Sequence, residues 1–342
     1  MKTLLTSIKS LFAIYVVLLI QSNCALSVSS THSGSQKALT FMTGLDALLD
    51  DNCEPLKGKR VGLITNQTGV SSGIIQNIEL FIESENVDLR AIFSPEHGLF
   101  GSISAGKKII DRNESKYEVP IFSLYGDTRK PSKEMLKDLD ILVFDIQDIG
   151  IRSYTYISTM GLAMDAAADK GIEFMVLDRP NPMGLNKIEG NVLDPRLSSF
   201  IGMYPIPYVY GLTAGELATM INDQDWLGES KCNLTIIKMR NYGREISYND
   251  LGSIWIPTSP HVPSFETPMY MVATGILGEL GIFSIGVGYT TPFMTMAAPW
   301  INSDRMAERM NMLDLEGVVS PPNLTSSSIL QEVRSGQIEH VH

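Results

Sequence analysis

An acidic and an imidazole side chain stand together in the segment Phe93-Ser94-Pro95-Glu96-His97-Gly98, which ends an apolar run typical of a strand. In open α/β sheets, ligands bind in the crevice beyond the carboxyl ends of the strands. A carboxylic acid in apolar surroundings keeps its proton, as general acid catalysis of glycoside cleavage requires. The neighbouring Leu99 and Phe100 favour this role for Glu96. The alternative is a Pro/Gly turn whose polar side chains only face water.

Four other apolar runs also end in polar residues. They are followed by Asn66-Gln67-Thr68, Tyr125-Gly126-Asp127, Asp145-Ile146-Gln147-Asp148 and Asp178-Arg179-Pro180-Asn181. Any one of these groups alone is most often a helix cap or an Asx turn. Their repetition at one edge of a parallel sheet favours a binding cleft instead. Carboxylates, amides and tyrosines such as Tyr154 suit a carbohydrate, whose hydroxyl groups need both donors and acceptors.

A glycosidase normally has a second carboxylate near its general acid. Asp148 is our first candidate, and four other carboxylates stay open: Asp145, Asp178, Glu189 and Glu279. His97 either orients Glu96 or is an ordinary turn histidine. Arg152 and Arg179 each either pair with a neighbouring aspartate or bind an anionic group of the substrate as a bidentate fork.

A metal site formed by Glu96, His97, Asp145 and Asp148 is a minor alternative, because hydrolytic metals use such ligands. None of these residues lies in an HxH or HxxxH motif, so we expect no metal. No GxGxxG motif follows the first predicted strand, and no GxxxxGK[ST] motif occurs. We therefore expect no nucleotide cofactor.

Short apolar runs alternate with amphipathic segments from Gly58 onward, which is typical of βαβ units around a mainly parallel sheet. The predicted strands are 60–65, 89–93, 121–124, 141–146, 174–177 and 234–239. The predicted helices are 74–85, 133–138, 158–170 and 214–222. The third helix should stop at Gly171. These elements predict an α/β fold.

Two further segments frame this domain, which we place at residues 44–245. Pro- and Gly-rich sequence over 246–342 indicates a second, smaller domain, whose apolar stretch 276–287 is either a strand or a buried loop. Residues 1–25 are typical of a signal peptide, and the Ser-rich residues 26–43 of a flexible tether. We therefore expect an exported protein, with Cys24 as a candidate site for a lipid anchor.

The composition limits the class of protein. The chain has 342 residues, of which 44% are hydrophobic and 19% charged, so it is globular and long enough for two domains. Its net charge of −11 argues against nucleic acid as a partner, because such binding depends on clustered lysines and arginines. No run of 18 apolar residues predicts a transmembrane span.

Taken together, the polar segments and the strands before them resemble the motifs of a known family. They are Gly58–Gly69, Phe93–Gly98, Ser123–Gly126, Val143–Gly150, Tyr154–Tyr156 and Leu177–Pro182. In this order they resemble the exo-β-N-acetylmuramidase family, from about residue 44 to residue 301. The resemblance implies a Rossmann-like domain, a smaller C-terminal domain that closes a cleft, and release of terminal N-acetylmuramic acid from peptidoglycan fragments. It also implies that Glu96 is the catalytic acid and that six motif positions line the sugar site: Asn66, His97, Asp145, Gln147, Arg152 and Tyr154.

The sequence departs from the family's pattern after Glu279, which stays a substrate-binding candidate. An Asn and an Arg of the family are replaced by Ile282 and Val287, which leaves the exact sugar open because an Arg is the natural partner of the lactyl carboxylate. The polar stretch 320–342 is unlike the family's continuation and predicts a C-terminally truncated member. We expect a cell-wall glycoside hydrolase; the alternative is a non-catalytic binding protein for wall sugars.

Overall fold

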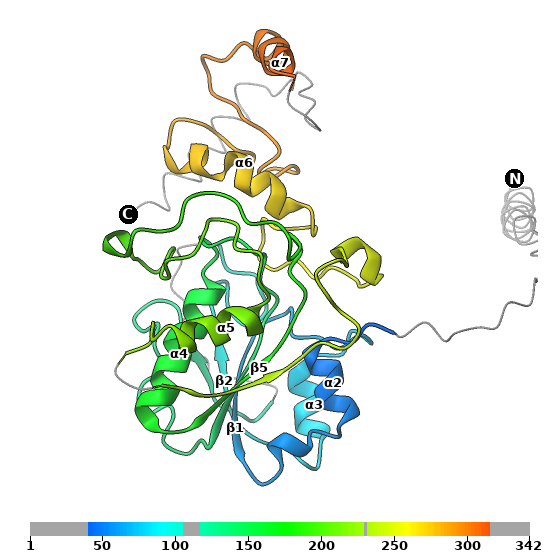
Figure 1. Cartoon of the computed structure of the whole chain (residues 1–342), viewed down its shortest axis with the longest axis vertical. Coiled ribbons are helices and arrows are strands. Elements are labelled where there is room, and N and C mark those ends of the chain that lie inside the picture. Colours follow the sequence, from blue (N-terminus) through cyan, green and yellow to red (C-terminus); the bar gives the residue numbers. More distant parts are fainter. Residues whose placement is uncertain (1–39, 105–116, 229–230, 315–342) are drawn as a thin grey trace, which may run out of the picture. The chain divides into compact units, whose positions relative to one another are not determined.

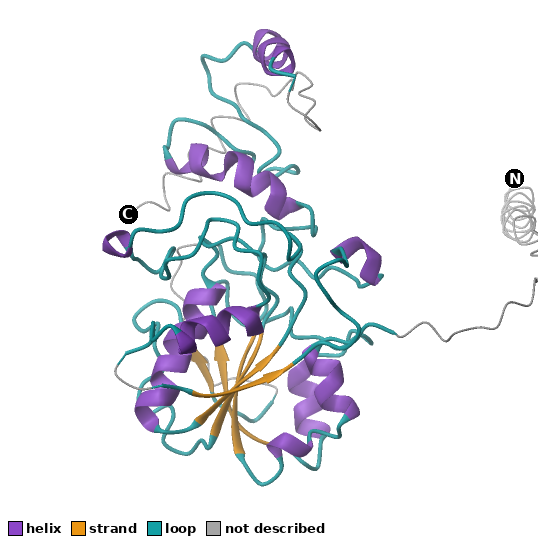
Figure 2. Cartoon of the chain, viewed as in Figure 1, coloured by secondary structure: helices purple, strands orange, loops and turns teal. Residues whose placement is uncertain are grey.

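Six parallel strands form one sheet in the part of the chain that the computed structural model describes, residues 40–104, 117–228 and 231–314 (Figures 1 and 2). The strands are β1 (Arg60–Thr65), β2 (Asp88–Ser94), β3 (Ile121–Ser123), β4 (Ile141–Asp145), β5 (Glu173–Leu177) and β6 (Asn233–Ile237). Their order is β3-β2-β1-β4-β5-β6, which is the order of a doubly wound, Rossmann-like sheet. The predicted α/β class is confirmed, and the switch point of the sheet lies between β1 and β4.

Helices cover both faces of the sheet, which explains why the central strand β4 is buried at every residue. Alternate residues of one strand point to opposite faces. Leu63 joins the core beneath α2 (Gly44–Asp50) and α3 (Asn77–Glu83), whereas Ile64 joins the core beneath α4 (Tyr156–Lys170) and α5 (Ala214–Asp223). In Figure 1 the two helix pairs lie on opposite sides of the strands.

Helix α4 begins where the polar segment after β4 ends, so its N-terminus lies at the carboxyl edge of the sheet. Thr155 is its N-cap residue, and Gly171 ends it with a left-handed φ of 75°. That conformation favours glycine, and the predicted stop is confirmed.

The remaining elements are short or lie late in the chain. They are the 3-10 helices Glu54–Leu56, Pro195–Leu197 and Tyr248–Leu251 and the helices α6 (Thr267–Glu279) and α7 (Ser303–Met312). None of the helices in the described ranges is long and apolar enough to cross a membrane.

The predicted strands differ from the observed ones by at most two residues at an end. The helix predicted over 133–138 is wrong, because those residues form successive turns. Helix α2 was not predicted, although Thr43 and Asp46 form a capping box at its start. The stretch 276–287 is not a strand: its first residues end α6, and Ser284 forms only an isolated bridge with Ala297.

Candidate active site

The carboxyl edge of the sheet gathers most of the predicted site residues. Parallel register places Thr65 beside Asp145, so the polar segments after β1 and β4 start from adjacent strands. Seven predicted side chains at this edge are buried besides Glu96: Asn66, His97, Asp145, Gln147, Asp148, Tyr154 and Arg179. Arg152 is partly buried. Glu279 differs from them, since it is exposed at the end of α6 and pairs with no other described residue.

Glu96 lies just beyond the end of β2 and is 7% exposed. The Thr155 hydroxyl donates a hydrogen bond of 2.7 Å to Oε2 of Glu96, and Thr155 makes no side-chain cap for α4. The N-cap side chain is therefore used to hold the carboxyl group at the positive end of a fifteen-residue helix. Leu99 is buried, as expected for an apolar neighbour, but Phe100 is 67% exposed and does not enclose Glu96.

His97 adopts a left-handed φ of 70° and fixes the loop that follows it. Its Nδ1 lies 2.7 Å from the carbonyl oxygen of Ile103. A carbonyl oxygen only accepts, so Nδ1 is the donor in this hydrogen bond. The ring is thus oriented by its own loop.

Asp145 and Arg179 form a buried ion pair. Nε of Arg179 donates to Oδ1 of Asp145 at 2.5 Å and Nη2 to Oδ2 at 3.1 Å, while Nη2 also reaches the carbonyl oxygen of Val70. Asn77 donates to Oδ2 of Asp145 at 2.7 Å. Of the two alternatives for Arg179, the structure shows pairing with a neighbouring aspartate.

Gln147 and Asn66 connect the segments after β1, β4 and β5. Nε2 of Gln147 donates to the carbonyl oxygens of Asp148 and Pro180, at 2.8 and 2.7 Å. Thr68 donates to Oδ1 of Asn66 from both its amide and its hydroxyl. Nδ2 of Asn66 is buried and makes no hydrogen bond of normal geometry with a described residue.

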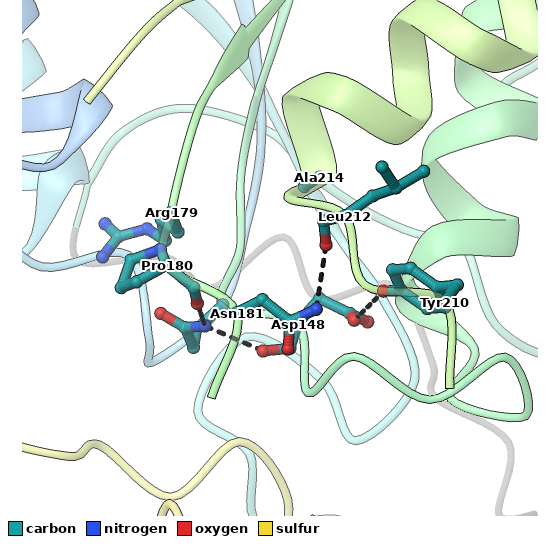
Figure 3. A pocket seen from close by; sticks show the side chains of 8 residues that line it. Asp148, Arg179, Pro180, Asn181, Tyr210, Leu212 and Ala214 are labelled. Carbon is teal, nitrogen blue, oxygen red and sulfur yellow. Dashed lines mark hydrogen bonds between the residues drawn. The ribbon is translucent and has the colours of Figure 1, made fainter. Parts of the chain in front are cut away.

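Asp148 lines a small pocket together with Gln147, Arg179, Asn181 and Tyr210 (Figure 3). The Tyr210 hydroxyl and the amide of Gly150 donate to its Oδ2, whereas the buried Oδ1 has no hydrogen bond within the described ranges. Burial raises the pKa of Asp148 to about 6, although the Tyr210 hydroxyl and two backbone amides favour the charged form.

Glu96 and Asp148 share a neighbourhood through two tyrosines. The rings of Tyr154 and Tyr156 meet edge to face with centroids 4.7 Å apart. Burial raises the pKa of both phenols, and the charge of Asp148 adds to the rise for Tyr154, as that of Glu96 does for Tyr156. The two carboxyl groups therefore lie near the same aromatic pair.

A segment that we expected in the second domain, around Thr258, forms hydrogen bonds with this edge of the sheet. The sequence did not predict this contact. Nε2 of Gln67 donates to the carbonyl oxygens of Pro257 and Thr258, at 2.8 and 3.1 Å. The hydroxyl of Tyr154 donates to Oγ1 of Thr258 at 2.8 Å, and that of Tyr156 to its carbonyl oxygen at 2.5 Å. The run of prolines around Thr258 was the available sequence signal, because such a segment needs outside partners for its carbonyl groups.

Among the residues that the structure describes, no three His, Cys, Asp or Glu side chains form a group that could hold a metal ion. Cys53 and Cys232 are both free and buried.

The buried ion pair makes a stability prediction. Replacing Asp145→Ala leaves Arg179 charged and unpaired in the interior, which should lower the free energy of unfolding by about 3–5 kcal/mol. Asp140→Ala is the matched control, because Asp140 also receives two bonds from an arginine, Arg60, but both side chains are 42% exposed. Asp140→Ala should lower the free energy of unfolding by about 1 kcal/mol or less. Equal losses in urea unfolding would contradict the role of the Asp145 pair.

The raised pKa of Asp148 makes a prediction about pH. The native state binds this proton more tightly than the unfolded chain, so the stabilisation is complete below the ordinary pKa of 3.8 and is lost as pH rises through about 6. Asp148→Asn stays neutral and keeps an acceptor for Tyr210. We expect it to exceed the wild type in unfolding free energy by about 1–3 kcal/mol at neutral pH, but not near pH 4.

Urea unfolding at these two pH values measures this difference. Asp178→Asn is the control, because the pKa of Asp178 is likewise raised to about 6 by burial, yet both of its oxygens accept hydrogen bonds, from Thr213 and Gly215 among others. The NH2 group of an asparagine at position 178 would face one of these hydrogen-bond donors, which leaves both donors without an acceptor. If Asp148→Asn is also destabilising at neutral pH, the charged carboxylate is the form that the fold requires.

Comparisons with known proteins identify the family of the chain. Residues 61–266 match the family model "Exo-beta-N-acetylmuramidase NamZ, N-terminal", and residues 269–327 match its C-terminal counterpart, so a separate C-terminal domain follows the sheet domain. The chain is 43% identical over 312 residues to the peptidoglycan β-N-acetylmuramidase NamZ of Bacillus subtilis, covering 91% of this chain and 74% of that protein.

Two crystal structures of DUF1343 family proteins from Bacteroides fragilis are also similar. One is 50% identical with a TM-score of 0.77, covering 82% of this chain and 71% of that one. The other is 28% identical with a TM-score of 0.64, covering 86% of this chain and 91% of that one. With both domain models matched in order, the chain belongs to the exo-β-N-acetylmuramidase family of glycoside hydrolases.

Proposed function

We propose that this protein is an exported exo-β-N-acetylmuramidase that releases a terminal N-acetylmuramic acid, or a closely related amino sugar, from peptidoglycan fragments. The observation that carries the proposal is the position of Glu96, a buried carboxyl group held by Thr155 at the carboxyl edge of the sheet. The 43% identity to the B. subtilis peptidoglycan β-N-acetylmuramidase supports the substrate class.

Glu96 acts as the general acid in this proposal. The Thr155 hydroxyl donates a hydrogen bond to Oε2 of Glu96 and so orients the carboxyl group whose proton is transferred. Transfer of that proton to the glycosidic oxygen lets the bond to the sugar's C1 break without forming an alkoxide. Asp148 stays our candidate for the second carboxylate, supported by its unpaired Oδ1 and by the tyrosine pair that it shares with Glu96.

Export rests on the sequence alone, since residues 1–39 lie outside the described part. The lysines Lys2 and Lys9 precede an apolar core over 11–20, and Cys24 follows as the candidate lipid site. N-terminal analysis of the protein made in a bacterial host tests this, because an intact Met1 on the mature protein would contradict processing.

Glu96→Gln tests the chemistry. The amide keeps the shape but has no acidic proton, so kcat on a muramic acid disaccharide should fall by about 10²–10⁴-fold with little change in KM. A 4-nitrophenyl glycoside needs little protonation of its leaving group, so the same variant should lose much less activity on it. Glu173→Gln is the matched control, because Glu173 starts β5 at the opposite edge of the sheet and pairs with Lys59.

Equal losses on the two substrates would remove Glu96 from the acid role. Tight binding of the disaccharide by the wild-type protein without any turnover would instead support the alternative function, a binding protein for wall sugars. This alternative stays open because Ile282 and Val287 stand where the family has an Asn and an Arg.

A further inference from the structure

Arg152 is a partly buried cation without a carboxylate partner in the described part of the chain. Its Nη1 donates to two backbone carbonyl oxygens, those of Asn191 at 2.7 Å and Ile206 at 2.5 Å. Its guanidinium carbon also lies 5.6 Å from the centroid of the Tyr208 ring. Carbonyl dipoles and a ring face hold the group in place without neutralising its charge.

The other arginines of the described ranges differ from Arg152 in one of two ways. Most pair with a carboxylate: Arg60, Arg90, Arg179, Arg196, Arg240 and Arg244. The rest are exposed, such as Arg129, which lies over the Phe200 ring at 4.2 Å. Among the arginines that the structure describes, Arg152 is therefore the one that is partly buried and has no carboxylate partner. Such a cation favours an anion from outside the chain.

The backbone fixes where this cation is presented. The amide of Arg152 donates to the carbonyl oxygen of Tyr208 at 2.8 Å, and Ile151 forms a bridge with Val209. With Nη1 already bound to the carbonyl groups, Nη2 and Nε make no hydrogen bond to a described residue. These two nitrogens form one side of the guanidinium fork, the side that binds a carboxylate with two parallel hydrogen bonds.

Arg152 is close in sequence to Thr155, which contacts the proposed general acid. It stands three residues before Thr155, so their Cα atoms are separated by at most about 11 Å. The hydroxyl of Thr155 contacts the carboxyl group of Glu96 at 2.7 Å. In muramic acid the lactyl carboxylate is attached through O3, so it lies within the breadth of one sugar ring from C1.

We propose that Arg152 binds the lactyl carboxylate of the terminal sugar and thereby makes the enzyme prefer muramic acid over sugars that lack this group. The inference rests on the proposed function and adds a specificity-determining residue to it. Arg179 does not compete for this role, because its fork is occupied by Asp145.

The test compares 4-nitrophenyl N-acetylmuramic acid with the same glycoside whose lactyl group is a neutral amide. The wild-type enzyme should prefer the acid by roughly 10²-fold in kcat/KM, since charge-assisted pairs exceed neutral ones. Arg152→Met should abolish this preference, because its kcat/KM on the acid falls by much more than its kcat/KM on the amide. Arg152→Lys, which retains the charge but not the fork, should show an intermediate preference. Arg129→Met, the matched control, should keep the wild-type preference.

Two results would overturn the inference. One is an Arg152→Met variant that prefers the acid over the amide as strongly as the wild type does. The other is an equal loss of kcat/KM on both substrates in Arg152→Met and in Arg152→Lys, which would indicate a purely structural role. If the wild-type protein cleaves neither substrate, the proposed function fails on its own. Calorimetric binding of the two glycosides to the wild type and to Arg152→Met then decides the inference, which predicts that only the wild type binds the acid more tightly than the amide.

Discussion

The ion pair between Asp145 and Arg179 is the constraint on which the carboxyl edge of the sheet depends. Asp145 ends β4, Arg179 follows β5, and Arg179 also bonds the carbonyl oxygen of Val70 in the segment after β1. A charged pair with 0% and 6% exposed side chains is tolerated only with complete hydrogen bonding, which Asn77 helps to supply. Because of this pair, segments that follow different strands have fixed positions relative to one another.

The edge therefore contains two kinds of polar residue. Asp145, Arg179 and Gln147 are hydrogen-bonded to other parts of the chain and act as a scaffold. Others have a buried polar atom without a hydrogen bond of normal geometry to a described residue, namely Nδ2 of Asn66, Oε1 of Gln67 and Oδ1 of Asp148, and one side of the Arg152 fork is also free. A polar ligand such as a sugar would satisfy groups of the second kind, at the place where ligands bind in open α/β sheets.

Much of this was predictable from the sequence, because strands and their ends are local features. Apolar runs such as 141–146 predicted β4, and the polar residues that follow placed Asp145, Gln147 and Asp148 at the correct edge. The predicted helix over 133–138 failed because six residues do not offset the cost of nucleation, so turns form instead. Whether Arg179 would meet Asp145 or a ligand could not be decided, since the two are 34 residues apart and only the sheet order brings them together. The attachment of Thr258 to Tyr154 and Tyr156 is a contact of still longer range.

The most direct test of the central claim is a crystal structure of the Glu96→Gln variant with a disaccharide that ends in N-acetylmuramic acid. We expect the sugar to lie beyond the ends of β1, β2 and β4, with the glycosidic oxygen within hydrogen-bond distance, about 3 Å, of the side chain at position 96. A sugar bound elsewhere, or one whose glycosidic oxygen faces solvent far from this side chain, would contradict it.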